Sequence, residues 1–267
     1  MPRVALVLAF HAYALGAIAY LALLSGGRGR EGLVWTARLL TGTGWLLHGL
    51  GLAALLSGQG WRPHGLAQSL SVVAFLLVAL LLIIELRTHA PVLGAFLAPA
   101  AVAVWLPALW AGPGQETLAG SARTPMLVFH IGVALAGLAV FAVATAVAVA
   151  FLLLERQVKG KRFGVLFDRL PSLELLDGLN RRLVVWGFIA LSLTLVTGLW
   201  ITSTTEGTRS VQAVEITTAV AWLVYAALLQ ARLLAGWRGR RVAWLTMAGF
   251  GLLVLSFVGT YGPGGVR

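Results

Sequence analysis

Apolar stretches of about 20 residues recur along almost the whole chain, and this repetition limits the fold more than any other feature. A helix that crosses the hydrocarbon core of a bilayer needs roughly 20 predominantly apolar residues. Of the 267 residues, 59% are hydrophobic and only 11% are charged, whereas about a quarter of the residues in a soluble domain carry charge. The sequence therefore predicts an all-α, polytopic membrane bundle that forms a single transmembrane domain over residues 1–267.

Hydropathy predicts about eight transmembrane helices. The expected spans are residues 3–25, 33–56, 65–86, 91–110, 125–154, 182–201, 211–234 and 241–261. No basic leader or small-residue cleavage site precedes the first span, so we expect it to be retained as a helix.

Basic residues are concentrated in alternate connections between these spans. The second, fourth and sixth connections carry one arginine each, at Arg62, Arg123 and Arg209. The fifth and seventh connections carry most of the rest: Arg156, Lys159, Lys161, Arg162, Arg169, Arg181, Arg182, Arg238, Arg240 and Arg241. Cytoplasmic loops are enriched in lysine and arginine, so both termini are predicted to be extracytoplasmic. The net charge of +11 is interpreted as a topology signal and not as a sign of nucleic-acid binding.

The segment 156–181 is expected to be a basic interfacial loop on the cytoplasmic side. Its residues after Ser172 follow a helical period, with Ser172 as N-cap and Glu174 in the first turn. A topology anchor is the simpler interpretation, and a docking surface for a partner is the alternative. Near the same membrane boundary, Arg38 is expected to extend toward lipid phosphate and Glu85 to be interfacial.

Three of the five histidines are expected in the outer half of the bilayer. His130 should lie roughly 8 Å from the outer boundary, and His48 and His11 roughly 13 Å from it. Ionisable groups at membrane depth usually face the bundle interior and mark functional sites. Haem iron accepts one or two axial imidazoles, so the three histidines are candidate ligands that converge in one pocket.

Small residues beside these histidines predict space for a flat ring. Gly44 and Gly51 lie on the same helix face as His48. Close helix packing through small residues is the alternative interpretation, and it also leaves a homodimer open. The chain has no cysteine, so any haem must be held non-covalently, as haem b is. The residues offer no nucleophile–base arrangement, so we expect no enzymatic activity.

Three segments carry a family resemblance: HIGVALAGLAVFAVATAVAVAFLLLERQVKGK, LPSLELLDGLNRRLVVWGFIALSLTLVTGLW and AWLVYAALLQARLLAGWRGRRVAWLTMAGF. In this order they resemble the cytochrome c assembly superfamily of haem-handling membrane proteins, which includes CcsA, CcmC and HemX. The resemblance implies that His130 corresponds to an outward-facing histidine of the family. The tryptophan-rich WWD segment of haem-exporting members is absent, Gln230 occupies the position of a membrane histidine, and SFVGTYGPGG lacks the expected later histidine. The chain therefore looks most like the HemX-type branch.

Two functional hypotheses follow from these residues. The first is a non-catalytic, haem-binding or haem-handling protein of the bacterial inner membrane, related to cytochrome c assembly or tetrapyrrole biosynthesis. The second is a haem-free membrane scaffold that binds cytochrome c assembly proteins or a haem-pathway enzyme through its basic loop. A transporter for another small molecule ranks last, since matched broken helices are not evident.

Overall fold

The computed structural model describes residues 2–25, 30–59, 65–110, 125–161, 167, 169–204 and 213–261. Within these residues the regular structure is entirely helical, which confirms the predicted all-α bundle. The elements are α1 (Pro2–Ala22), α2 (Arg30–Gln59), α3 (Leu66–Thr88), the short 3-10 helix η1 (Pro91–Leu93), α4 (Gly94–Trp110), α5 (Pro125–Lys159), α7 (Leu173–Thr204), α8 (Ala213–Leu234) and α9 (Arg240–Tyr261). Four of the arginines on which the predicted topology rests lie outside the described residues: Arg62, Arg123, Arg162 and Arg209.

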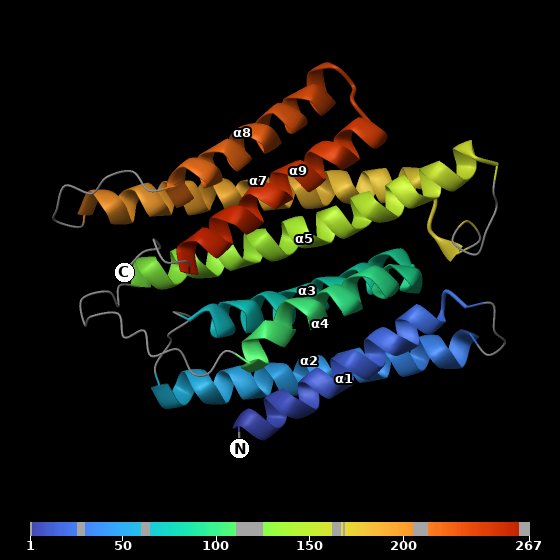
Figure 1. The fold of residues 1–267 in the computed structure, drawn as a ribbon, viewed down its shortest axis with the longest axis horizontal. Coiled ribbons are helices and arrows are strands. Elements are labelled where there is room, and N and C mark those ends of the chain that lie inside the picture. Colours follow the sequence, from blue (N-terminus) through green and yellow to red (C-terminus); the bar gives the residue numbers. More distant parts are fainter. Residues whose placement is uncertain are drawn as a thin grey trace.

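Seven of the described helices are long and apolar enough to cross a membrane, by length and composition. Helix α2 has 30 residues, about 45 Å at 1.5 Å per residue, so it is also long enough to cross the membrane. The protein is therefore a multi-pass membrane protein. α1 begins and α9 ends at the same end of the bundle, on the left of Figure 1, as an even number of spans requires. Which side of the membrane this end faces stays a prediction.

Helix α7 differs from the expected pattern because it runs without a break from Leu173 to Thr204. The Ser172 hydroxyl oxygen accepts a hydrogen bond from the backbone N–H of Leu175 at 3.3 Å, which confirms the predicted N-cap. The predicted start of this span at residue 182 is therefore wrong, since residues 173–181 belong to the same helix, while the interfacial position of residues 156–181 stays a prediction. Leu176, Asn180 and Val184 are buried at intervals of four, so the face that packs in the span continues into this segment.

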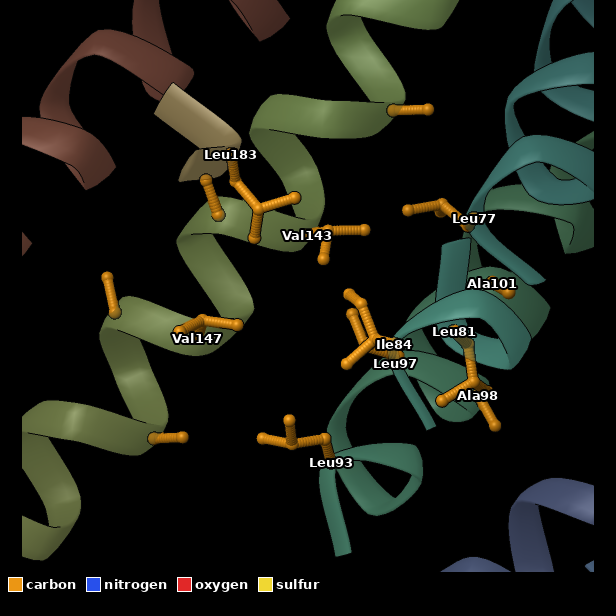
Figure 2. Packing of buried hydrophobic residues seen from close by; sticks show 14 of the residues in the cluster. Leu77, Leu81, Ile84, Leu93, Leu97, Ala98, Ala101, Val143, Val147 and Leu183 are labelled. Carbon is orange, nitrogen blue, oxygen red and sulfur yellow. The ribbon is translucent and has the colours of Figure 1, made fainter. Parts of the chain in front are cut away.

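The helices form two halves, α1–α4 and α5–α9 (Figure 1). In the first half α1 packs against α2 and α4, and in the second α5 packs against α7 and α9. The halves meet where α3 and α4 contact α5. Figure 2 shows this seam, with Leu77, Leu81 and Ile84 on one side and Val143 and Val147 on the other.

Small residues at helix crossings serve packing inside the chain. A Cβ added at Gly16 would lie 2.6 Å from the Thr41 methyl group, because α1 and α2 approach closely there. A Cβ at Gly137 would lie 3.2 Å from Ala190, where α5 meets α7. These contacts support the packing interpretation of small residues at these positions.

Candidate functional site

The three intramembrane histidines do not converge, so the hypothesis of one shared pocket is wrong. His48 lies on α2 in the first half, whereas His130 lies on α5 in the second. His11 on α1 is exposed, and its Nδ1 is 2.8 Å from the carbonyl oxygen of Val7 on the same helix. Sequence reasoning placed the three rings at similar depth but could not place them around the bundle axis.

His48 is enclosed in the first half with no exposed surface. Its Nε2 is 2.8 Å from the hydroxyl of Ser71, and its Nδ1 is 3.3 Å from the hydroxyl of Tyr13. One face of the ring stacks on Trp105, with centroids 3.8 Å apart. Since both nitrogens have partners and the ring face is covered, His48 has no free position for a metal in this arrangement.

The glycines near His48 do not open a slot for a flat ring. A Cβ at Gly44 would lie 2.8 Å from the Tyr13 ring, because Tyr13 occupies the space beside that helix face. A Cβ at Gly49 would lie 3.3 Å from Phe75. Gly51 is buried. The structure therefore supports the packing interpretation at Gly44 and gives no cofactor slot there.

His130 is arranged differently, with one ring nitrogen held and the other available. Its Nδ1 is 2.8 Å from Oγ1 of Thr197 on α7. The Thr197 hydroxyl has backbone carbonyls as acceptors at 2.7 Å (Leu193) and 3.1 Å (Thr194). The hydroxyl proton is therefore used on the backbone, so Thr197 accepts and His130 Nδ1–H donates. Nε2 then carries the lone pair. The hydrogen-bond partners of the ring are Thr197 and the backbone of Thr194, both on α7.

A cavity of about 200 Å³ lies beside His130, between α5, α7, α8 and α9. Apolar side chains form most of the wall, including Leu135, Phe141 and Leu253. The polar groups on the lining are hydroxyls and the one imidazole: His130, Thr194, Thr218, Ser256, Thr260 and Tyr261. No described residue that lines the cavity is Asp, Glu, Lys or Arg. An apolar pocket with a few convergent polar groups is the usual form of a small-molecule site.

Two features of this site were not found from the sequence. The first is Gly198, where a Cβ would lie 3.2 Å from Cε1 of His130, so the absence of a side chain lets the ring lie against α7. The second is Thr197, 67 positions from its histidine along the chain. The sequence signal for this site is a glycine next to a threonine in an apolar span. This pair alone does not show which histidine the span faces.

A second buried polar cluster links α1, α2 and α3 in the first half. The Glu85 side chain is 2% exposed, accepts a hydrogen bond from the Tyr20 hydroxyl at 2.7 Å and pairs with Arg38 at 3.3 Å. The predictions that Glu85 is interfacial and that Arg38 extends to lipid phosphate are therefore wrong. Arg38 pairs with Glu85 because a buried carboxylate needs a partner inside the bundle.

No described residues form a group of three or more His, Cys, Asp or Glu side chains that could hold a metal ion. His89 is exposed and caps the C-terminus of α3 with a left-handed backbone conformation.

Comparison with known proteins shows similarity to cytochrome c assembly and biogenesis proteins. A family model described as cytochrome C assembly protein matches residues 63–262, from just before α3 to the end of α9. The inner membrane protein YpjD of Escherichia coli is 31% identical over 137 residues, which are 51% of each chain. Two cytochrome c biogenesis proteins CcsA from Synechococcus sp. strains are 28% identical over 218 residues and 26% identical over 227 residues, and each match covers 72% of this chain.

The extent of these matches differs along the chain. The present chain spans about half the length of the YpjD proteins that it matches, and 72% and 71% of the length of the two CcsA proteins. The matched family region contains His130 and the whole cavity lining. It excludes all of α1 and α2, where His11 and His48 lie.

Proposed function

Because the chain belongs to the cytochrome c assembly protein family, we propose that it binds haem non-covalently as cargo, with His130 as an axial ligand. It is a multi-pass protein of the bacterial inner membrane. The proposal places the haem iron at Nε2 of His130, next to the cavity between α5, α7, α8 and α9. His48 and His11 have no part in it, because one is fully enclosed and the other faces outward.

The observation that carries the proposal is the hydrogen bond between His130 and Thr197. Histidines that bind metals generally donate their other ring N–H to a protein acceptor, which fixes the tautomer and raises the basicity of the ligating nitrogen. Thr197 supplies that acceptor at 2.8 Å and is itself 4% exposed. This hydrogen bond orients the ring of His130 and, in the neutral imidazole, leaves the lone pair on Nε2.

The chemistry of the cavity lining suits a bound haem, whereas the cavity volume is large enough for only part of it. Its apolar wall suits the face of a porphyrin, and its hydroxyls supply neutral polar contacts. Its volume of about 200 Å³ is below the range of roughly 300–1,000 Å³ for sites that enclose drug-sized ligands. Bound haem would therefore keep part of its ring outside the cavity, as expected of a site that receives and releases a cargo.

The proposed role has no catalytic step carried out by this chain. The cavity lining supplies one imidazole and several hydroxyls, without a carboxylate beside them among the described residues. Haem b is the expected form, since a chain without cysteine cannot attach haem through thioether bonds. Partners that deliver or accept haem, expected to be cytochrome c assembly proteins, would supply any covalent chemistry.

The test is haem binding by the protein in mild detergent. We expect added haem to give a Soret band that titrates to one site, and His130→Ala to weaken binding by at least about tenfold. His130→Gly should bind again when free imidazole is added, because imidazole can enter the space left by the side chain. His11→Ala is the matched control, since it removes an intramembrane histidine that faces outward. Absence of a Soret band in the wild type, or equal binding by His130→Ala, would contradict the proposal.

A further inference from the structure

Exposed arginines gather around one buried arginine at the end of the second half that is predicted to be cytoplasmic. Arg232 is near the end of α8, and its side chain is 6% exposed. Arg181 on α7 directly follows Asn180, which accepts a hydrogen bond from Arg232. Arg238 directly precedes Gly239, whose backbone N–H donates to the same Asp177 that pairs with Arg232, so both arginines lie close to it. Arg181, Arg238, Arg240 and Arg241 are exposed, and we name them the arginine surface.

A network of hydrogen bonds holds this surface in place. An Nη atom of Arg232 donates to Asp177 at 3.2 Å and to the side-chain oxygen of Asn180 at 3.0 Å. Asp177 also accepts the backbone N–H of Gly239 at 3.3 Å, which ties the connection between α8 and α9 to α7. Asn180 in turn donates to the carbonyl of Ala144 on α5 at 3.0 Å. These bonds link α5, α7, α8 and the connection between α8 and α9, and they fix the positions from which the arginines extend.

The positive charge of this region is not balanced within the described residues. Asp177 is the one carboxylate that pairs with Arg232 there. Nε of Arg232 is buried and has no hydrogen-bond partner. With four further arginines exposed nearby, the summed field favours an anion at the surface.

Apolar groups adjoin the arginine surface. Leu233 and Leu234, at the end of α8, are 83% and 86% exposed. Trp237 is half-buried, and the guanidinium carbon of Arg241 lies 5.5 Å from the centre of its ring. Tryptophan and arginine next to exposed leucines are typical of the membrane boundary, where an acyl chain and a headgroup meet. The anion that fits this surface therefore has an apolar part.

We propose that the arginine surface binds the phosphate of an anionic phospholipid from the adjacent leaflet, with the acyl chains against Leu233 and Leu234. This site is separate from the cavity at His130, which lies at the opposite end of α7, α8 and α9. It does not depend on haem binding. Arginines at membrane surfaces are worth about 1 kcal/mol each toward anionic lipids.

The test compares lipids of different charge on the full-length protein. Thermal unfolding is measured in phosphatidylcholine nanodiscs with and without phosphatidylglycerol, and bound lipid is counted by native mass spectrometry. We expect phosphatidylglycerol to raise the unfolding temperature of the wild type and to stay bound. The double variant Arg181→Gln, Arg238→Gln should bind it about 30-fold more weakly, which corresponds to about 2 kcal/mol.

The control removes equal charge at the same end of the bundle. Lys159→Gln with Lys161→Gln takes away two exposed positive charges on or next to the end of α5. It should respond to phosphatidylglycerol like the wild type. If the Arg181 and Arg238 variant does not fold in phosphatidylcholine, Arg241→Gln alone should give about a fivefold loss. Equal loss in the lysine control, or no loss in either arginine variant, would overturn the proposal.

Inorganic phosphate separates a lipid from a soluble anion. We expect it not to raise the unfolding temperature of detergent-purified protein, because it lacks the apolar part that contacts Leu233 and Leu234. Stabilisation by inorganic phosphate equal to that by phosphatidylglycerol would assign the site to a soluble phosphate compound and overturn the lipid proposal.

Discussion

The imidazole of His48 lies flat against the indole of Trp105, with ring centroids 3.8 Å apart and an interplanar angle of 4°. The same imidazole has hydrogen-bond partners in Tyr13 on α1 and Ser71 on α3. One side chain on α2 thus contacts the other three long helices of the first half. A polar residue with partners on every side fixes the relative position of helices, and this is the role that we assign to His48.

Replacing His48 by alanine should destabilise the protein without changing haem binding. The change removes the stacking on Trp105, worth about 0.5–1.5 kcal/mol, and leaves the Ser71 hydroxyl without its partner, at about 1–3 kcal/mol. We expect a loss of about 2–4 kcal/mol in denaturant unfolding, against less than about 0.5 kcal/mol for exposed His11→Ala. A normal unfolding midpoint combined with lost haem binding would show that His48 acts as a ligand after all.

Replacing Glu85 by alanine should also destabilise the first half. Tyr20 and Arg38 would both lose their buried acceptor, and breaking a buried ion pair costs about 3–5 kcal/mol. Arg38 is 33% exposed and can turn toward water, so we expect about 2–3 kcal/mol. Glu155→Ala is the matched control, because Glu155 pairs with the exposed Lys159 at i,i+4, where such pairs contribute about 0.5 kcal/mol or less. Equal unfolding midpoints for the two variants would contradict this prediction.

The fold could be predicted because the solvent for most side chains is lipid. Hydropathy over windows of about 20 residues locates helices such as α3 and α9 within a few residues. It missed the start of α7, because residues 173–181 carry charges and the span was predicted to begin at residue 182. The helix continues there because one buried face, including Leu176 and Asn180, extends beyond the membrane-spanning part.

The site could be predicted only in part, because sequence gives depth along a helix and not position around the bundle. His48 and His130 were placed at comparable depth, yet they lie in different halves. Glu85 was assigned to the interface by its place near a helix end. Its burial depends on Tyr20 and Arg38, which are 65 and 47 positions away. Such partners are known only once the helices are packed.

Replacing Thr197 by valine should weaken haem binding while leaving the fold intact. Valine has nearly the same shape, but it cannot accept the N–H of His130 Nδ1. Loss of the hydrogen-bond partner of a metal-binding histidine typically reduces affinity by about 10–100-fold. The Soret maximum should shift because the imidazole becomes a weaker donor. Thr197→Ser keeps the hydroxyl and should retain wild-type binding. Equal affinities for the valine and serine variants would contradict the assigned hydrogen bond.

Replacing Gly198 by valine should displace the His130 ring. A Cβ there already lies 3.2 Å from Cε1 of His130, and two further methyl groups on a β-branched residue must push the ring away from α7. We expect a marked loss of haem affinity, measured by the same titration. Gly49→Val is the matched control, since its Cβ would crowd Phe75 at 3.3 Å in the other half. It should lower stability and leave the affinity per folded protein unchanged; a similar affinity loss in both would assign the effect to general misfolding.

Esterifying both propionates of haem should leave its affinity for this site within about threefold, or roughly 0.6 kcal/mol. Burying an unpaired carboxylate is costly, and no described residue on the cavity lining carries a positive charge. Haem should therefore present its uncharged edge to the cavity and keep the propionates outside. The measurement is a parallel titration with haem and its dimethyl ester, and His130→Ala must weaken both. A drop of tenfold or more for the ester alone would mean that a cation holds the propionates, while retained ester binding by His130→Ala would indicate unspecific partitioning into the apolar wall.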